Sequence, residues 1–173
     1  MLQVLHSLDP LPASVINGRF DVIARNGAYQ DLFTVWHDLP CVHHNTLWCC
    51  FAERDSREYL VNYAEEMPHL VARLRAEYAK HVGDPRWEED IHRLCERSDL
   101  FAELWARHEV AGPAERLRRF RHPKVGLLNL TNTELAVSAE ADLRISVYTP
   151  ADEQTRERLT RTRGAARVAN PAA

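Results

Sequence analysis

The sequence lacks the features of a membrane or secreted protein. No apolar run approaches the roughly 20 residues that a helix needs to cross a bilayer. The first residues also lack the charged and apolar regions of a secretion signal. We therefore expect a cytoplasmic protein that has no membrane partner.

Cysteine is scarce, with four residues in a chain of 173, namely Cys41, Cys49, Cys50 and Cys95. Because Cys49 and Cys50 are adjacent, they cannot easily both reach partners in a compact scaffold. This usage excludes a disulfide framework, and we expect reduced thiols.

An excess of positive charge is missing as well. The 22 Lys and Arg residues stand against 25 Asp and Glu residues, which gives a formal net charge of -3. Domains that bind the phosphate backbone of nucleic acids directly are usually basic. The sequence therefore argues against unaided DNA binding.

Catalytic motifs are also absent. The chain has no Gly-rich phosphate loop, no nucleophile elbow and no ordered pair of carboxylates. Ser98 and His108 are ten residues apart on one predicted helix, which places them about 15 Å apart along its axis and prevents them from forming a nucleophile–base pair. Ser98 is interpreted as a helix cap instead, and we expect neither enzymatic activity nor a cofactor.

Helical periodicity dominates the first two thirds of the chain. Asn26 and Asn45 are suited to begin two short helices, and further helices are predicted over 86–97, 98–108 and after Pro150. A long amphipathic helix over 57–81, with a kink or helix junction at Pro68, is predicted from apolar residues at intervals of three and four: Leu60, Ala64, Met67, Val71, Leu74 and Tyr78.

Alternating sequence predicts a sheet with one buried face in the last third of the chain. The expected strands lie near 116–122, 125–132, 135–138 and 144–148. Asn17-Gly18 also predicts a tight two-residue turn between two short strands within 11–24. A chain of this length forms one domain, and we expect the α+β class, with an antiparallel sheet covered by several helices.

Two groups of polar residues are candidates for binding. Arg116, Arg118, Arg119 and Arg121 are interpreted as an exposed strand, where they protect the sheet edge or form surface ion pairs rather than contact phosphates. A second group, around the two adjacent cysteines, contains side chains that zinc uses, although the spacing matches no zinc motif and adjacent residues on a helix point about 100° apart. Its members are His37, Cys41, His43, His44, Cys49 and Cys50.

Aromatic residues are spread over helices that must all cover one face of a small sheet. Pockets for apolar ligands are lined in this way, with a few polar groups that orient the ligand. A fully packed core would have the same composition, so the aromatic residues leave both interpretations open. They are Phe33, Trp36, Trp48, Phe51, Tyr63, Trp105 and Phe120.

A set of segments in a fixed order resembles the MmyB-like ligand-binding domain, which occurs in helix-turn-helix transcription regulators. The similarity extends from about residue 7 to residue 162. The segments are Leu8-Asp-Pro-Leu-Pro-Ala13, Arg19-Phe-Asp-Val-Ile-Ala-Arg-Asn-Gly-Ala28, Asn45-Thr-Leu-Trp-Cys-Cys-Phe51, Val71-Ala-Arg-Leu-Arg75, Ser98-Asp-Leu-Phe-Ala-Glu-Leu-Trp-Ala-Arg-His-Glu-Val110, Arg121-His-Pro-Lys-Val-Gly126 and Val147-Tyr-Thr149.

This resemblance implies a PAS-like sensor domain over residues 7–162, and we expect residues 163–173 to form a flexible tail. It also implies a hydrophobic cavity for a small apolar, fatty-acid-like effector. An Xre-type helix-turn-helix DNA-binding domain usually precedes such a sensor; that domain is absent from this chain, so it would act when fused or in trans. DNA would be contacted only indirectly, and we expect a homodimer.

Side-chain direction and position within the family pattern together predict the cavity. Its polar anchor is His108, and its wall consists of Phe33, Phe51, Tyr63, Leu104, Trp105, Leu128 and Leu130. Two alternatives remain. One is a ligand-free dimerisation module with a filled core. The other is a metal- or thiol-based sensor formed by Cys41, His43, His44, Cys49 and Cys50.

Overall fold

The computed structural model describes residues 2–34, 44–53 and 56–162. One antiparallel sheet has the strand order β2-β1-β5-β4-β3. The first and last strands of the chain, β1 and β5, pair with each other inside the sheet. Segments near the two ends of the chain are therefore hydrogen-bonded to each other. The strands are β1 (Ala13–Asn17), β2 (Val22–Arg25), β3 (Arg116–His122), β4 (Gly126–Ala136) and β5 (Leu143–Pro150).

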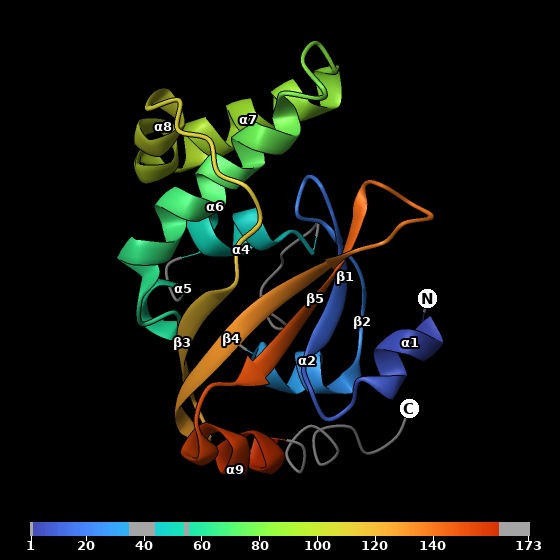
Figure 1. The fold of residues 1–173 in the computed structure, drawn as a ribbon. Coiled ribbons are helices and arrows are strands. Elements are labelled where there is room, and N and C mark those ends of the chain that lie inside the picture. The colour runs from blue at the N-terminus through green and yellow to red at the C-terminus, as the bar shows by residue number, and fades with distance from the viewer. Residues whose placement is uncertain (1, 35–43, 54–55, 163–173) are drawn as a thin grey trace, which may run out of the picture.

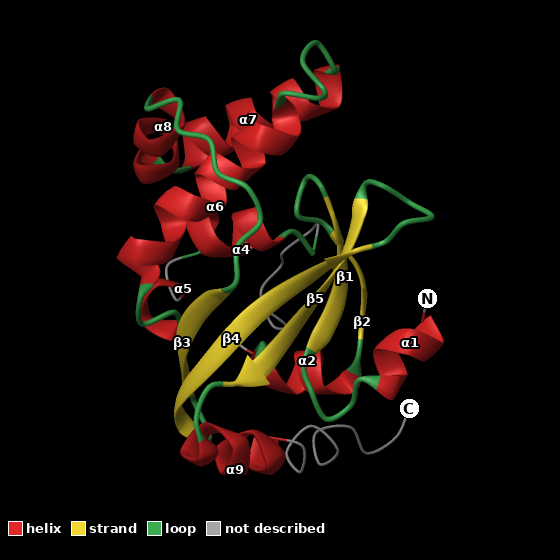
Figure 2. Ribbon diagram, viewed as in Figure 1, coloured by secondary structure: helices red, strands yellow, loops and turns green. Residues whose placement is uncertain are grey.

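Helices α4 to α8 gather in one group beside the sheet, while α1 lies next to β2 and α9 lies at one end of the sheet (Figures 1 and 2). This arrangement confirms the predicted α+β class, a PAS-like antiparallel sheet covered by helices. No helix in the described part of the chain is long and apolar enough to span a bilayer. The helices are α1 (Leu2–Ser7), α2 (Gly27–Leu32), α4 (Thr46–Ala52), α5 (Ser56–Tyr59), α6 (Tyr63–Tyr78), α7 (Pro85–Arg97), α8 (Asp99–Ala106) and α9 (Glu153–Thr162).

Three predicted helix caps are confirmed. The side chain of Asn26 accepts a hydrogen bond at the start of α2, Asn45 accepts two at the start of α4, and Ser98 accepts one at the start of α8. Short polar side chains at these positions satisfy backbone N–H groups that have no partner within the helix. These helix starts are therefore determined locally.

The helix predicted over 57–81 is interrupted at a different place. Helix α5 ends at Tyr59, α6 begins at Tyr63, and α6 continues through Pro68. The reason for the break is tertiary: Leu60 forms a β-bridge with Phe120, and the backbone N–H of Val61 donates to the Arg119 carbonyl of β3 at 2.7 Å. The Leu60 N–H still donates to the Ser56 carbonyl as in a helix, and pairing with the sheet replaces the helical hydrogen bond at Val61.

The predicted two-residue turn at Asn17-Gly18 is wrong, although β1 and β2 do pair as a hairpin. The connection is longer, because the Asn17 side chain accepts hydrogen bonds from the backbone of Arg19 and Asp21 and organises a wider turn. The left-handed residue is Phe20, with φ of 68°. Phe20 is buried, and this burial of apolar surface offsets the unfavourable backbone conformation.

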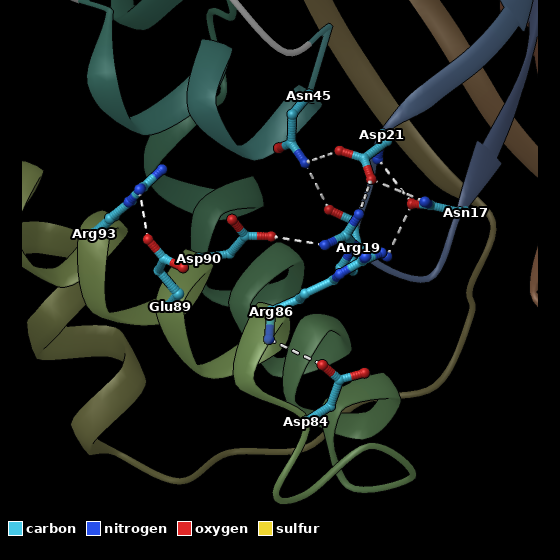
Figure 3. A network of polar contacts seen from close by, with 9 residues as sticks. All are labelled: Asn17, Arg19, Asp21, Asn45, Asp84, Arg86, Glu89, Asp90 and Arg93. Atoms are coloured by element: carbon cyan, nitrogen blue, oxygen red, sulfur yellow. Dashed lines mark hydrogen bonds and ion pairs between the residues drawn. The ribbon is translucent and has the colours of Figure 1, made fainter.

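The β1–β2 connection docks onto two helices through polar contacts (Figure 3). The Arg19 guanidinium contacts the Asp90 carboxylate of α7 at 3.1 Å. The Asn45 side-chain amide, at the start of α4, donates to the Arg19 carbonyl and to Asp21 Oδ1, each at 2.8 Å. The hairpin is thereby fixed against the helical group.

Both faces of the sheet are partly covered, whereas the sequence predicted one buried face. On the face toward α4–α6, Leu130 and Tyr148 belong to the main hydrophobic core. On the opposite face, Val15 and Val147 form a second cluster with Leu5 of α1. Because neighbouring residues of a strand point to opposite faces, Val147 and Tyr148 necessarily belong to different clusters.

Candidate functional site

Helix α6 carries three buried charged residues on the face that meets the sheet. They are Glu66, Arg73 and Glu77, spaced by seven and four residues, so they lie along one stripe of a helix with 3.6 residues per turn. Burying an ionised side chain is unfavourable unless an opposite charge accompanies it. The stripe therefore requires counter-charges from the sheet.

Strand β3 provides the counter-charges for Glu66. Arg116 donates two hydrogen bonds to Glu66 Oε1, at 2.9 Å from Nε and 2.8 Å from Nη2. The Arg118 guanidinium lies 3.4 Å from Glu66 Oε2. Alternate residues of a strand point to the same face, which explains why both arginines reach one carboxylate.

Strands β4 and β5 pair with the rest of the stripe. Arg73 forms an ion pair with Glu134 of β4, and Glu77 forms one with Arg144 of β5. Lys80 also contacts Glu77, at 2.7 Å. Helix α6 is thus held to three strands by charge pairs in addition to its apolar packing.

A pocket of about 120 Å³ opens between α6, the α8–β3 connection and strands β3 and β4. For comparison, an engineered cavity of about 150 Å³ holds a benzene molecule. The backbone N–H of Ala111 donates to the Ala72 carbonyl, which ties the α8–β3 connection to α6 at the pocket edge. The lining residues are Glu66, His69, Leu70, Arg73, Ala111, Gly112, Ala114, Arg116, Arg118, Asn132 and Glu134.

Two smaller cavities of about 10 Å³ each, roughly the space of one water molecule, share Leu70 and Arg118 with this pocket. The first has polar walls that include Tyr29, Ser146 and Tyr148, and Arg118 donates to the Tyr148 hydroxyl at 3.1 Å. The second is mainly apolar, with Leu60, Met67 and Phe120 among its walls. Arg118 therefore lies where a charged pocket, a polar cavity and an apolar cavity meet.

Within the part of the chain that the structure describes, several polar atoms of the pocket residues have no hydrogen-bond partner. They are Arg73 Nε, Arg118 Nε and Glu134 Oε2. Burial lowers the pKa of the Arg73 guanidinium below its ordinary value, although Glu134 opposes the shift. Burial would also lower the pKa of the Arg118 guanidinium, but Tyr148 and Glu66 raise it above its ordinary value. The pocket still offers unused hydrogen-bonding capacity.

The eight predicted site residues occupy different surroundings from this pocket. Phe33, Phe51, Tyr63, Leu104, Leu128 and Leu130 are buried in the main core, Trp105 is half-buried and packs against it, and His108 is exposed with φ of 56° just beyond α8. None of the eight lines the three cavities described above.

The aromatic residues of the predicted wall lie in two groups of rings. The ring centroid of Phe33 is 5.4 Å from those of Phe120 and Tyr148. Phe51 packs edge-on against Phe101 at 5.1 Å and lies 6.5 Å from Tyr63. In this conformation the rings contact one another directly.

The prediction that the arginines of β3 lie on an exposed strand is wrong for two of them. Arg116 and Arg118 were expected on an exposed strand, but both turn toward α6 and reach Glu66. A signal was present in the sequence, because Glu66, Arg73 and Glu77 share one helical stripe. Strand alternation alone does not reveal which face of β3 meets the helices, so the partners could not be identified.

The cysteine and histidine segment is only partly described. His37, Cys41 and His43 lie outside the described residues, His44 is exposed, and Cys49 and Cys50 are buried. Within the described ranges, no group of three His, Cys, Asp or Glu side chains is arranged to hold a metal ion.

The chain matches a known protein family. The family described as the MmyB-like transcription regulator ligand binding domain matches residues 1–161. A search of curated proteins finds no match.

Proposed function

Because this chain belongs to the family of MmyB-like transcription regulator ligand-binding domains, we propose that it is the effector-sensing part of a bacterial, cytoplasmic regulator. Its effector is a small, fatty-acid-like molecule with a large apolar part. A helix-turn-helix domain, fused or in trans, reads the DNA, and the sensor forms a homodimer. This role requires no catalytic step.

The observation that carries the proposal is the pocket between α6 and the sheet, which adjoins the apolar core through the cavity beside Arg118. An effector can shift a regulator only through a difference in affinity between two conformations. A molecule lodged between α6 and the sheet contacts both elements, so its affinity depends on their spacing. Helix α6 is therefore the element that the effector would move.

The apolar part of the effector would extend from the pocket into the aromatic core. Its wall would then include Phe33, Phe51, Tyr63, Leu104, Trp105, Leu128 and Leu130, whose rings and methyl groups would separate to admit the chain. His108 is exposed beyond the end of α8, so the charged residues of the pocket are better placed than His108 to anchor a polar group.

Native mass spectrometry and lipid extraction of the purified protein test this function, together with thermal unfolding in the presence of apolar compounds. A ligand at 100 times its dissociation constant should raise the free energy of unfolding by about 2.7 kcal/mol. Leu70→Phe should abolish the increase, because Leu70 lines all three cavities. Leu135→Phe, at an exposed position of β4, is the matched control.

Failure of every apolar compound to bind or to raise the unfolding temperature would contradict the sensor function. Two roles would then remain, a ligand-free dimerisation module and a metal- or thiol-based sensor formed by Cys41, His43, His44, Cys49 and Cys50. Sedimentation equilibrium measures the oligomeric state independently, and a monomer at all concentrations would remove the homodimer from the proposal.

A further inference from the structure

The charged side chains that line the pocket do not balance. Three guanidinium groups, those of Arg73, Arg116 and Arg118, face two carboxylates, those of Glu66 and Glu134. The side chains of Glu66, Glu134 and Arg73 are at most 10% exposed, and those of Arg118 and Arg116 are 16% and 28% exposed. One positive charge is therefore in excess in a largely buried place, where an uncompensated charge is strongly unfavourable.

The charged groups nearest to the pocket do not remove the excess. Arg144 and Glu77 balance each other, and Glu77 also contacts Lys80. His69 at the pocket is exposed and brings no negative charge. An anion bound in the pocket would therefore supply the negative charge that its own side chains lack.

We propose that this pocket binds the carboxylate of the effector, with Arg73 of α6 and Arg118 of β3 as its principal partners. The inference rests on the proposed function, because it assigns the polar end of the molecule that the domain senses. A guanidinium presents parallel N–H donors that match the two oxygens of a carboxylate. A single negative charge restores the balance, which favours a monocarboxylate over a neutral compound or a dianion.

The size of the pocket limits what surrounds the carboxylate. A volume of about 120 Å³ accommodates a short acid completely. A longer acid fits only if its chain leaves the pocket, and the apolar cavity beside Arg118, with Leu60, Met67 and Phe120, is its route into the core. The carboxylate has the same partners in both cases, so the length of the chain distinguishes a free short acid from a fatty acid.

Binding would also tighten the contact between α6 and the sheet. Arg73 and Arg118 lie on different elements and repel each other across the pocket. A carboxylate between them replaces this repulsion with two attractions, so the bound state favours a closer approach of α6 to β3. This gives the effector the difference in affinity between conformations that a sensor needs.

Two variants that change the pocket charge in opposite directions test the inference. Glu134→Gln raises the excess to two positive charges and should tighten carboxylate binding by about tenfold. Arg116→Gln removes the excess and should weaken carboxylate binding by about tenfold. One close charge has an effect of this order in a protein interior. Each variant loses one ion pair, so a general loss of stability cannot produce shifts of opposite sign. Arg93→Gln, at an exposed pair with Glu89 on α7, should change nothing.

Isothermal titration calorimetry of the whole chain measures these affinities with butyrate, octanoate, butyramide and octanamide. We expect the acids to bind more tightly than the amides. Tighter binding of octanoate than of butyrate would identify the effector as a fatty acid rather than a short free acid. Circular dichroism checks that each variant is folded. Arg116 is partly exposed at the pocket rim. If Glu134→Gln does not fold, Arg116→Gln must lower the affinity for the acids and leave the affinity for the amides unchanged.

Equal affinity for acids and amides, or affinities that do not respond to the two variants, would overturn the inference. Octanamide binding without any advantage for octanoate would reject the carboxylate site and leave the proposed function intact. Binding of butyrate without any long-chain ligand would reject the fatty-acid-like effector and leave the carboxylate site intact. If none of the four compounds binds, both proposals fail.

Discussion

At the residue scale, Asn26 shows how one side chain joins several parts of the fold. Its Oδ1 accepts hydrogen bonds from the backbone N–H groups of Ala13 and Tyr29, each at 3.0 Å. Its Nδ2 donates to the carbonyls of Leu5 and Leu11, at 3.2 and 2.9 Å. The amide therefore caps α2 and at the same time fixes β1, α1 and the segment between them.

Replacing Asn26 by alanine should lower the free energy of unfolding by about 3 kcal/mol, because a cap is lost and buried backbone groups are left without partners. Urea denaturation followed by circular dichroism measures the change. Asp84→Ala is the matched control, since Asp84 caps α7 through one exposed hydrogen bond and should cost only about 1 kcal/mol. Equal losses in the two variants would show that the additional contacts of Asn26 contribute nothing.

At the element scale, α6 makes two kinds of contact, apolar packing and charge pairs, and the spacing of its residues predicts only the first. Its apolar residues, such as Met67, Val71 and Leu74, follow the spacing from which the helix was predicted and lie in the main core. Its charged stripe, formed by Glu66, Arg73 and Glu77, interrupts that apolar pattern. The stripe connects the helix to the strands that border the pocket, so the orientation of α6 depends on both sets of residues.

Glu77→Gln should destabilise the protein by about 3 kcal/mol at neutral pH, because Arg144, whose side chain is only 12% exposed, would lose its counter-charge. Burial alone would raise the pKa of Glu77, but Lys80 and Arg144 lower it below its usual range. A lowered carboxyl pKa adds stability that is complete above the unfolded-state pKa of about 4.3 and is lost as the pH falls through the folded-state value. The variant should therefore show a flatter decline in stability below about pH 5.

Urea denaturation at a series of pH values measures both effects. Glu89→Gln, which removes an exposed pair with Arg93 on α7, should stay within about 0.5 kcal/mol of the original protein. An acid dependence in Glu77→Gln as steep as that of the original protein would assign the acid sensitivity to other carboxylates.

At the scale of the whole molecule, the main core is continuous between the helical group and the sheet. Its members come from both, including Met67 and Leu94 of the helices and Phe120, Leu130 and Tyr148 of the strands. The second cluster attaches α1 to the opposite face of the same sheet. Neither group can expose its part of the shared core without a large loss of buried apolar surface.

We therefore expect residues 7–162 to unfold as one cooperative unit. The fluorescence of Trp48, Trp87 and Trp105 reports on α4, α7 and α8, and hydrogen exchange of the β4 and β5 amides reports on the sheet. Both probes should give the same free energy of unfolding in urea. A helical group that loses its fluorescence signal before the strand amides become exposed would show two units instead.

Features that depend on neighbours a few residues apart follow from the amino-acid sequence alone. The caps at Asn26, Asn45 and Ser98, the strand over 116–122 and the α+β class all follow from side chains that act on their own stretch of backbone. The break at Leu60 differs from the prediction because Leu60 pairs with a distant strand. The turn after Asn17 differs because the Asn17 side chain accepts hydrogen bonds from the backbone of its own turn.

The pocket and its charge arise from contacts between distant parts of the chain. Arg116 and Glu66 are 50 residues apart in the chain, and alternation along β3 is compatible with either face of the strand pointing toward α6. Which face points inward depends on how the whole sheet packs against the helices, because that packing balances apolar burial against the pairing of buried charges. The arginines that the sequence placed at a surface therefore became, through folding, the lining of a pocket.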